Sequence, residues 1–310
     1  MKKIYRSLLF VPGHKPDWAV KAPKFMPDGL ILDLEDAVPW TQKDVARGHV
    51  SDVIESMRDW TGALFVRINP WSSGYAVKDV LGVLRDGLTG IMLPKVRSSK
   101  DIISLDHLLT ELEIERGMPQ GAVEIMPLWE TPYAMMTIYD CVVASTRVRR
   151  CGGGFVHSPG GDRDRSLGLT NTEGRLEQLY LSAKAVLEAK AAGLDQVFGG
   201  MSTDLSNLAI LQDVATRSRD FGCGGSMVIH PSHVAVVNEI FSPNQAAIDE
   251  AFALLEAMHA GVKQGDAAVR HNGKMVDIAM CRSSLELLEQ TQRFGKEIRA
   301  IPSEWKSAFR

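Results

Sequence analysis

The sequence lacks the marks of disulfide-rich, zinc-binding and membrane-spanning proteins. It has 4 cysteines in 310 residues, and none of them forms a C-x-x-C pair or shows zinc-finger spacing. We therefore expect reduced, buried thiols in a cytoplasmic protein. No apolar run approaches the ~18 residues that a membrane span needs. The first apolar run follows a basic N-terminus, but Pro12, His14, Lys15 and Asp17 interrupt it too early for a secretory signal.

A strong excess of one charge is also missing. The formal net charge is -3, so bulk electrostatics favour neither nucleic acid nor a membrane surface as a partner. With 45% hydrophobic and 24% charged residues, the composition is that of an ordinary globular protein. We expect a small molecule as the binding partner, and at most two domains for this length.

Short apolar runs, typical of buried strands, alternate along the chain with longer amphipathic stretches. The runs lie at Ser7–Pro12, Gly29–Asp36, Ala63–Asn69, Gly90–Val96, Val123–Glu130, Arg149–Val156, Asp195–Gly199 and Gly225–Pro231. Apolar residues at helical spacing predict helices over Thr41–Trp60, Asp101–Arg116 and Thr172–Ala192. In the last of these helices the apolar positions are Leu176, Leu179, Tyr180, Ala183 and Leu187.

This alternation predicts parallel strands covered by helices. Eight strands in ~230 residues favour a closed (β/α)₈ TIM barrel over an open sheet. The main alternative, a doubly wound sheet, usually has a glycine-rich phosphate loop after its first strand. Here that place holds Pro12-Gly-His-Lys-Pro16, which is no G-x-G-x-x-G motif. We therefore predict an α/β fold of the (β/α)₈ type over residues 1–242.

Residues 243–310 are predicted to form a C-terminal helical extension, or lid. Helical patterns cover Ala246–Gly261 and Arg282–Ile298, and Asn272-Gly273 between them predicts a turn. The apolar residues of this tail include Phe252, Leu254, Leu255, Met258, Leu285 and Leu288. Because a finished barrel leaves little free core for them, we expect a homo-oligomer.

Polar residues follow the predicted strands where chemistry collects in a barrel, at the C-terminal ends. These residues are Asp33, Glu35, Asp36, Arg67, Asn69, Lys95, Glu130 and His230. A single such carboxylate is more often a helix cap or an ion-pair partner, and a lone histidine is more often a core residue. Together on one face they are costly unless they are paired or bound to metal. Carboxylates opposite Arg67 suit Mg²⁺ and an anionic substrate.

Seven short segments, in order, resemble the citrate lyase β-subunit-like family within the HpcH/HpaI aldolase/citrate lyase superfamily, which includes malyl-CoA and citramalyl-CoA lyases. The segments are Arg6-Ser-Leu-Leu-Phe-Val-Pro-Gly13, Ile31-Leu-Asp-Leu-Glu-Asp-Ala-Val38, Val66-Arg-Ile-Asn-Pro70, Leu93-Pro-Lys-Val96, Ile229-His-Pro231, Val237-Asn-Glu-Ile-Phe-Ser-Pro243 and Gly273-Lys-Met-Val-Asp277. The resemblance implies a Mg²⁺-dependent carbon–carbon lyase. Its substrate would be a 3-hydroxyacyl-CoA such as malyl-, citramalyl- or citryl-CoA, and its products an acyl-CoA and a 2-oxo acid.

The resemblance also implies roles for individual residues. Glu130 and Asp162 would bind the metal, and Glu35 and Asp36 would hold its water ligands. Arg67 would be catalytic and would bind substrate. Further substrate contacts would come from Pro94, Lys95 and His230. Asp277, in Met275-Val-Asp277, would be the catalytic acid or base at a neighbouring subunit's site, in a homotrimer or a multiple of one.

The sequence departs from the family pattern at two loops, which leaves alternatives open. Thr131-Pro-Tyr-Ala134 follows the strand-five glutamate, where the family has a segment like Thr-Ala-Arg-Gly. Pro159-Gly-Gly-Asp162 stands where the family has Gly-x-Glu-Asp, so Asp164 is a second candidate for the metal aspartate. The alternatives for the whole chain are a class II aldolase on free hydroxy-oxo acids and a non-catalytic barrel. For Asp277 the alternative is a helix cap.

Overall fold

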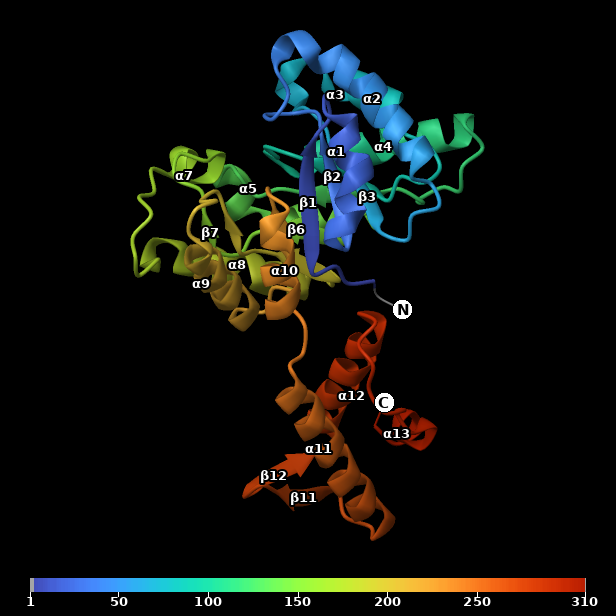
Figure 1. The fold of residues 1–310 in the computed structure, drawn as a ribbon, viewed down its shortest axis with the longest axis vertical. Coiled ribbons are helices and arrows are strands. Elements are labelled where there is room, and N and C mark those ends of the chain that lie inside the picture. The colour runs from blue at the N-terminus through green and yellow to red at the C-terminus, as the bar shows by residue number, and fades with distance from the viewer. Residues whose placement is uncertain (1–2, 310) are drawn as a thin grey trace. The chain divides into compact units, whose positions relative to one another are not determined.

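The structure, a computed structural model, describes residues 3–309. The chain divides into two compact units, Met1–Phe241 and Ser242–Arg310, one residue from the boundary expected from the sequence (Figure 1). None of the helices in the described part of the chain combines the length and apolar composition needed to cross a membrane.

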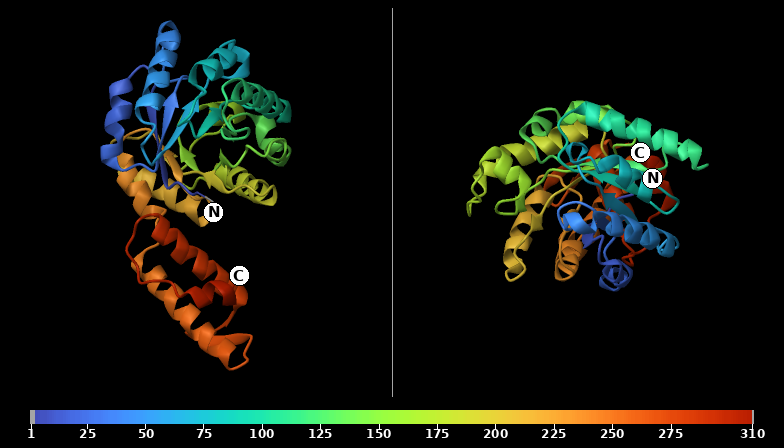
Figure 2. Two further views of the ribbon diagram at one scale, coloured as in Figure 1. Left: turned by 90° about the vertical axis from the view of Figure 1, so that its right-hand side faces the viewer. Right: turned by 90° about the horizontal axis from the view of Figure 1, so that it is seen from above.

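A curled, parallel sheet forms the centre of the first unit, and helices lie around its outside (Figure 2). Six strands form this sheet in the order β10-β1-β2-β3-β4-β5. Their bounds are β1 Ser7–Pro12, β2 Gly29–Asp33, β3 Ala63–Arg67, β4 Gly90–Leu93, β5 Glu124–Pro127 and β10 Ser226–Val228. The fold is therefore α/β with a half-barrel of parallel strands, as expected in its class.

Four further short strands pair in parallel, β6 with β8 and β7 with β9. Their bounds are β6 Arg150–Gly152, β7 Val156–His157, β8 Gln196–Phe198 and β9 Met201–Ser202. Isolated parallel bridges join Ile125 to Val148, Leu128 to Gly152 and Phe198 to Gly225. All eight runs predicted as strands thus contain strand residues, and apart from β1, which spans its whole run, the strands are shorter than the runs.

Side chains of the strands are buried on both faces of the sheet, as is usual for parallel strands covered by helices. One set packs on the helices and includes Leu9, Leu30 and Val66. The alternate residues point to the concave face, where Ile31 and Phe65 lie in a second apolar cluster. This two-residue alternation places both faces of each strand in apolar surroundings.

Ten α-helices and three 3₁₀ turns complete the first unit over its described residues. The α-helices are α1 Pro16–Lys21, α2 Lys43–Ser56, α3 Ala76–Val83, α4 Ser99–Glu115, α5 Pro132–Met136, α6 Ile138–Val143, α7 Asp162–Leu167, α8 Leu176–Ala191, α9 Leu208–Asp220 and α10 Ser232–Ile240. The 3₁₀ turns are η1 Ala22–Phe25, η2 Trp40–Gln42 and η3 Trp71–Ser73. Helices therefore form at all three stretches with helical spacing.

The second unit has three helices and a β-hairpin among its described residues. These are α11 Gln245–Lys263, β11 Ala268–His271, β12 Lys274–Asp277, α12 Ile278–Arg293 and α13 Ser303–Ala308. Asn272 and Gly273 both have positive φ, 46° and 76°, as a two-residue hairpin loop requires. The predicted turn is confirmed. The flanking strands were not predicted, so the extension is not purely helical.

The apolar residues of the tail bury one another. Phe252, Leu255 and Met258 of α11 pack with Leu285 and Leu288 of α12. Leu254, Trp305 and Phe309 belong to the same cluster. The hairpin and α13 complete a small core within the unit, so these residues do not need a barrel or a neighbouring subunit to cover them, contrary to expectation.

Candidate active site

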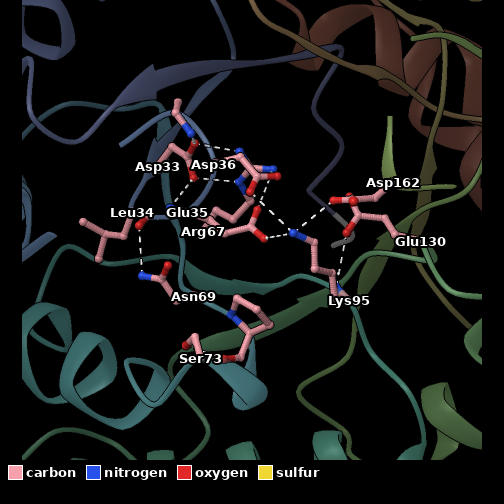
Figure 3. A network of polar contacts seen from close by, with 12 residues as sticks. Asp33, Leu34, Glu35, Asp36, Arg67, Asn69, Ser73, Lys95, Glu130 and Asp162 are labelled. Carbon is pink, nitrogen blue, oxygen red and sulfur yellow. Dashed lines mark hydrogen bonds and ion pairs between the residues drawn. The ribbon is translucent and has the colours of Figure 1, made fainter. Parts of the chain in front are cut away.

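Strand register brings two of the expected residues side by side. Asp33 ends β2, Arg67 ends β3, and the two are direct partners in the sheet. Asp33 accepts hydrogen bonds from Arg67 Nε at 2.7 Å and Nη2 at 2.6 Å (Figure 3). It also accepts from the backbone N–H groups of Glu35 and Ala37. Burial alone would raise the pKa of Asp33, but Arg67 and these hydrogen bonds lower it overall.

Glu35 continues the network toward β4. Its side chain is buried and makes ion pairs with Arg67 Nη1 at 3.1 Å and Lys95 Nζ at 2.6 Å. The pKa of Glu35 is nevertheless raised, since burial outweighs the two cations. Lys43 Nζ donates to the carbonyl oxygens of Leu34 and Glu35, each at 2.7 Å, and so holds the loop that carries Glu35.

Lys95 lies at the centre of the carboxylates (Figure 3). Its Nζ is 2.6 Å from Glu35, 3.0 Å from Asp162 and 3.4 Å from Asp36. Its backbone N–H donates to Glu130 Oε2 at 3.2 Å. Burial alone would lower the pKa of Lys95, but the surrounding carboxylates raise it. Lys95 also has a φ of 51°, an uncommon left-handed conformation for a side chain of this size.

Glu130 follows β5 and faces the same network. Burial is the main cause that raises the pKa of Glu130 to about 7, and Glu35 and Asp162 add to this, while Arg67 opposes it. A carboxyl with such a pKa takes up and releases protons near neutral pH, which suits either an acid–base group or a metal ligand that ionises on binding.

Replacing Glu130 with glutamine is expected to remove a pH-dependent loss of stability. The pKa of Glu130 rises from 4.5 to about 7 on folding, so its stabilising protonation is complete below pH 4.5 and is lost as the pH rises through 7. The wild type should therefore lose up to about 3 kcal/mol relative to Glu130→Gln across this range. Urea unfolding at pH 5 and pH 8 measures the difference, with the exposed Glu111→Gln as control. A pH-independent difference would contradict the prediction.

Asp162 and Asp164 are both on α7 but have different surroundings. Asp162 makes ion pairs with Lys95 and Arg165. Oxygen atoms of Glu35, Asp36 and Asp162 all lie within 4.8 Å of one another. Asp164 instead pairs with Arg163 at 3.3 Å and accepts a hydrogen bond from Asn171. The structure thus brings Asp162 into the carboxylate group, and Asp164 has partners of its own.

A cavity of about 500 Å³ opens onto this network. Its charged lining residues include Asp33, Arg67, Glu130 and both Asp162 and Asp164, and Phe10 and Trp129 are among its apolar ones. The guanidinium carbon of Arg67 lies 4.9 Å from the centre of the Phe10 ring. A cavity lined by both charged and apolar residues suits a small organic anion with an apolar part.

Glycines just after β6 and β8 let the two backbones lie close together at the wall of the cavity. A Cβ on Gly154 would lie 2.7 Å from both Cys223 Sγ and the Cα of Gly199. Only glycine allows this approach of the two backbones. The Gly152-Gly153-Gly154 run therefore shapes one wall of the cavity, a role that was not predicted from the sequence.

The remaining expected residues lie apart from the network. Pro94 is buried after β4, and His230 is exposed, with Nδ1 2.7 Å from Ser232 Oγ. Neither is among the residues that line the cavity. Asp277, in the second unit, is the N-cap residue of α12 and accepts a hydrogen bond from the N–H of Met280 at 3.1 Å. The helix-cap interpretation of Asp277 is confirmed, and its catalytic role stays a prediction.

Two residues that support the site were not given a role from the sequence. Asp33 orients Arg67, and Asn69 donates through Nδ2 to Asp79 at 2.7 Å and to the carbonyl of Leu34 at 2.9 Å. Both stand at predicted strand ends, so their position was a signal. Their partners come from other strands and helices, and sequence spacing does not reveal such pairs.

Comparison with known proteins agrees with the resemblance. Residues 6–231 match the HpcH/HpaI aldolase/citrate lyase family. The chain belongs to this family. A citrate lyase subunit beta-like protein of Deinococcus radiodurans is 31% identical over 300 residues, which cover 92% of this chain and 96% of that one. An L-malyl-CoA/beta-methylmalyl-CoA lyase of Rhodobacter capsulatus is 29% identical, with 94% and 95% covered.

Solved structures agree with the fold. A citrate lyase from Burkholderia xenovorans superimposes with a TM-score of 0.83 over 99% of this chain and 97% of its own, at 20% identity. Protein CitE from Mycobacterium tuberculosis, in complex with magnesium, acetoacetate and coenzyme A, gives a TM-score of 0.72 over 94% of this chain and 100% of its own, at 22% identity. At these identities the likeness concerns the fold alone.

Proposed function

We propose that this chain is a Mg²⁺-dependent carbon–carbon lyase that cleaves or forms a 3-hydroxyacyl-CoA, with an acyl-CoA and a 2-oxo acid as the other side of the reaction. One observation carries the proposal: carboxylates from β2, β5 and α7 converge with Arg67 on a single cavity. The lyase names of its relatives support the same chemistry.

In this proposal the strands of the first unit close into a complete (β/α)₈ barrel. Parallel bridges at Ile125–Val148 and Leu128–Gly152 connect β5 with the β6 segment. The bridge at Phe198–Gly225 connects β8 with the segment of β10, which pairs with β1. A closed ring explains why the carboxyl ends of distant strands reach one cavity.

The donor set fits magnesium. Mg²⁺ prefers a few carboxylates together with water and substrate oxygens. Glu130 and Asp162 would bind it directly, and Glu35 and Asp36 would hold its waters. The ammonium group of Lys95 already lies among three of these carboxylates, which supports the view that the group balances a cation. When bound, the metal would orient and polarise the oxygen that becomes the 2-oxo acid carbonyl.

Arg67 balances the negative charge of the substrate in this mechanism. Asp33 holds its guanidinium through two hydrogen bonds, so the group stays oriented along the cavity wall. The charge it faces is either the substrate carboxylate or the enolate that leaves as the bond breaks. Because this cation is already held in place, it can stabilise negative charge that develops in the transition state without having to move.

Asp277 would take the hydroxyl proton in cleavage, at the site of a neighbouring subunit in a homotrimer or a multiple of one. Asp277 is exposed within its own unit and is the last residue of the hairpin strand β12. The Met275-Val-Asp277 motif of the family supports the assignment. Pro94, Lys95 and His230 would contribute to substrate binding around the cavity.

A retro-cleavage assay tests the proposal. Malyl-, citramalyl- and citryl-CoA are offered with Mg²⁺ or with EDTA, beside the corresponding free hydroxy acids and hydroxy-oxo acids. Release of a 2-oxo acid from a thioester, only with the metal, is the expected result. Cleavage of free hydroxy-oxo acids alone would favour the aldolase alternative. Tight binding of acyl-CoA without turnover would indicate a non-catalytic barrel.

Asp162→Asn is expected to weaken Mg²⁺ binding by at least about tenfold, because it removes one of two charged ligands. Asp164→Asn is the matched control, with the same chemical change two residues away at a carboxylate that pairs with Arg163. Isothermal titration with Mg²⁺ measures both affinities, after circular dichroism shows that each variant is folded. The opposite order of effects would move the metal ligand to Asp164.

Lys95→Met is expected to tighten Mg²⁺ binding in the absence of substrate. The ammonium group of Lys95 contacts the same carboxylates and so competes with the metal. Its removal should raise the affinity about tenfold, which corresponds to about 1.4 kcal/mol. The titration is done at pH 8, with the exposed Lys100→Met as control. Unchanged or weaker binding would show that Lys95 is no competitor.

A further inference from the structure

Helix α8, Leu176–Ala191, turns its apolar face away from the protein. Leu176 is 75% exposed, Tyr180 67% and Leu187 70%. Leu179 and Ala183, in the same stripe, are exposed as well. The face that packs on the first unit instead carries small or polar residues, namely Gln178, Ser182, Ala185 and Ala189. A surface helix normally has the reverse arrangement.

Neighbouring helices extend this apolar surface. Helix α6 packs against α8, and α5 packs against α6. Their exposed apolar residues are Tyr133, Met136, Tyr139 and Val143. Monomeric proteins rarely leave large contiguous apolar areas in water. We call α8 together with these four residues the α8 face.

The α8 face is a cluster of uncovered apolar residues on neighbouring helices, whereas most of the apolar residues of the tail are covered. The apolar residues of α11 and α12 are buried within their own unit. The stripe on α8 runs from Leu176 to Leu187, about three turns of the 16-residue helix, or about 17 Å at the rise of an α-helix. It is long enough for a contact with another helix.

We propose that the α8 face binds the same face of a second copy of this chain, with the two α8 helices antiparallel about a twofold axis at Ala183. Two leucines of the stripe lie at equal spacing on either side of this residue. Leu179 precedes it by four residues and Leu187 follows it by four. A twofold axis therefore places Leu179 opposite the partner subunit's Leu187, twice. The small Ala183 lets the helices approach closely where they cross.

Charge supports a copy of the same chain as the occupant. The N-terminal end of α8 is acidic, with Glu177 in its first turn and Glu173 just before the helix. Its last turn carries the exposed Lys190, and the Glu188 nearby already pairs with Lys184. In an antiparallel pair, the acidic end of each helix lies beside the partner subunit's Lys190. The helix dipoles also oppose one another favourably. The α8 face is thus complementary in charge to a second copy of itself. An unrelated partner would need the same arrangement of charges.

Cross-linking tests the geometry. The four native cysteines are buried, so Ala183→Cys adds the accessible thiol of the chain. A short bismaleimide should link two chains of Ala183→Cys and leave Ser104→Cys, an exposed position on α4, as monomers on a denaturing gel. Equal linkage in the two variants, or none in Ala183→Cys, would overturn the proposal.

A charge exchange tests the pairing itself by sedimentation velocity. Each single substitution, Leu179→Glu or Leu187→Lys, places a charge in the contact without an opposite charge to pair with it. Each should therefore halve the mass of the assembly. The double variant should recover the wild-type mass, because position 179 of one chain faces position 187 of the other. Val45→Glu, at an exposed apolar residue of α2, should leave the mass unchanged.

Each other outcome counts against the proposal. A wild-type mass in both single variants means that α8 is not at an interface. A double variant that stays at the lower mass means that α8 contacts something other than an antiparallel α8. Neither result depends on lyase activity, so these experiments test the α8 contact independently of the proposed function.

Discussion

Arg67→Met is expected to lower the free energy of unfolding by about 3–5 kcal/mol, the usual cost of removing one partner of a buried ion pair. Asp33 and Glu35 are both buried and both pair with Arg67. Without the guanidinium, two carboxylates remain in a poorly solvated place, and of the two Glu35 keeps its ion pair with Lys95. Urea unfolding at pH 7.5 measures the loss.

The pH dependence of this loss has a definite direction. Arg67 lowers the pKa of Asp33 in the folded protein. The stability that this provides is present above the pKa of Asp33 in the unfolded chain and is lost as the pH falls through its lower folded pKa. The gap between wild type and Arg67→Met should therefore be widest near neutral pH and narrow toward acid. A gap that stays constant, or grows, in acid would contradict this account.

Two further variants separate charge from geometry. Arg67→Lys keeps a cation but lacks the planar fork that makes two hydrogen bonds to Asp33, so stability should be partly retained. Asp33→Asn combined with Arg67→Met removes one unpaired charge and should be more stable than Arg67→Met alone. Under conditions where all are folded, none should retain more than about a hundredth of the wild-type cleavage rate, given the usual weight of such electrostatic groups.

Asp277→Asn is expected to reduce cleavage by about 10²–10⁴-fold with little change in stability, as removal of a general acid–base group does. Asparagine is as good a helix cap as aspartate, so it preserves the hydrogen bond to the N–H of Met280 while it cannot accept the substrate proton. Asp266→Asn, at another exposed aspartate of the second unit, is the control and should be fully active.

Mixing two inactive variants tests whether Asp277 acts between subunits. If each site takes Glu130 from one chain and Asp277 from another, Glu130→Ala and Asp277→Asn chains exchanged in equal amounts restore about one quarter of the sites of a closed ring. Recovered activity is measured after subunit exchange is shown with labelled chains. A fully active Asp277→Asn enzyme ends the catalytic role. Exchanged but inactive mixtures end the role between subunits.

The sequence alone predicted the elements of this protein well. Short apolar runs such as Gly29–Asp36 are visible because both faces of a parallel strand are buried, and polar residues such as Arg67 mark where such a run ends. The Asn272-Gly273 turn was equally clear, since few other pairs adopt two successive positive φ angles. Ordered motifs then indicated the family, which the match over residues 6–231 confirms.

Only the tertiary structure decided how these elements serve the site. The hydrogen bonds of Asp33 with Arg67, the central place of Lys95 and the raised pKa of Glu130 arise from groups on different strands. Asp162 and Asp164 are equivalent in sequence spacing, and their neighbours in space separate them. Distances of this kind depend on strand register and loop conformation, which a linear pattern does not contain.

For the helices, too, the sequence predicted which faces are apolar, and the tertiary structure decided which of those faces are buried. Spacing in α8 predicted a helix with one apolar face, and that face proved to be exposed. The apolar tail was expected to need a partner, and it proved to cover itself. Sequence periodicity determines that an apolar face exists, because it follows from the helical repeat. Which surface covers that face depends on competition among all the packing partners of the folded chain, and tertiary structure alone resolves that competition.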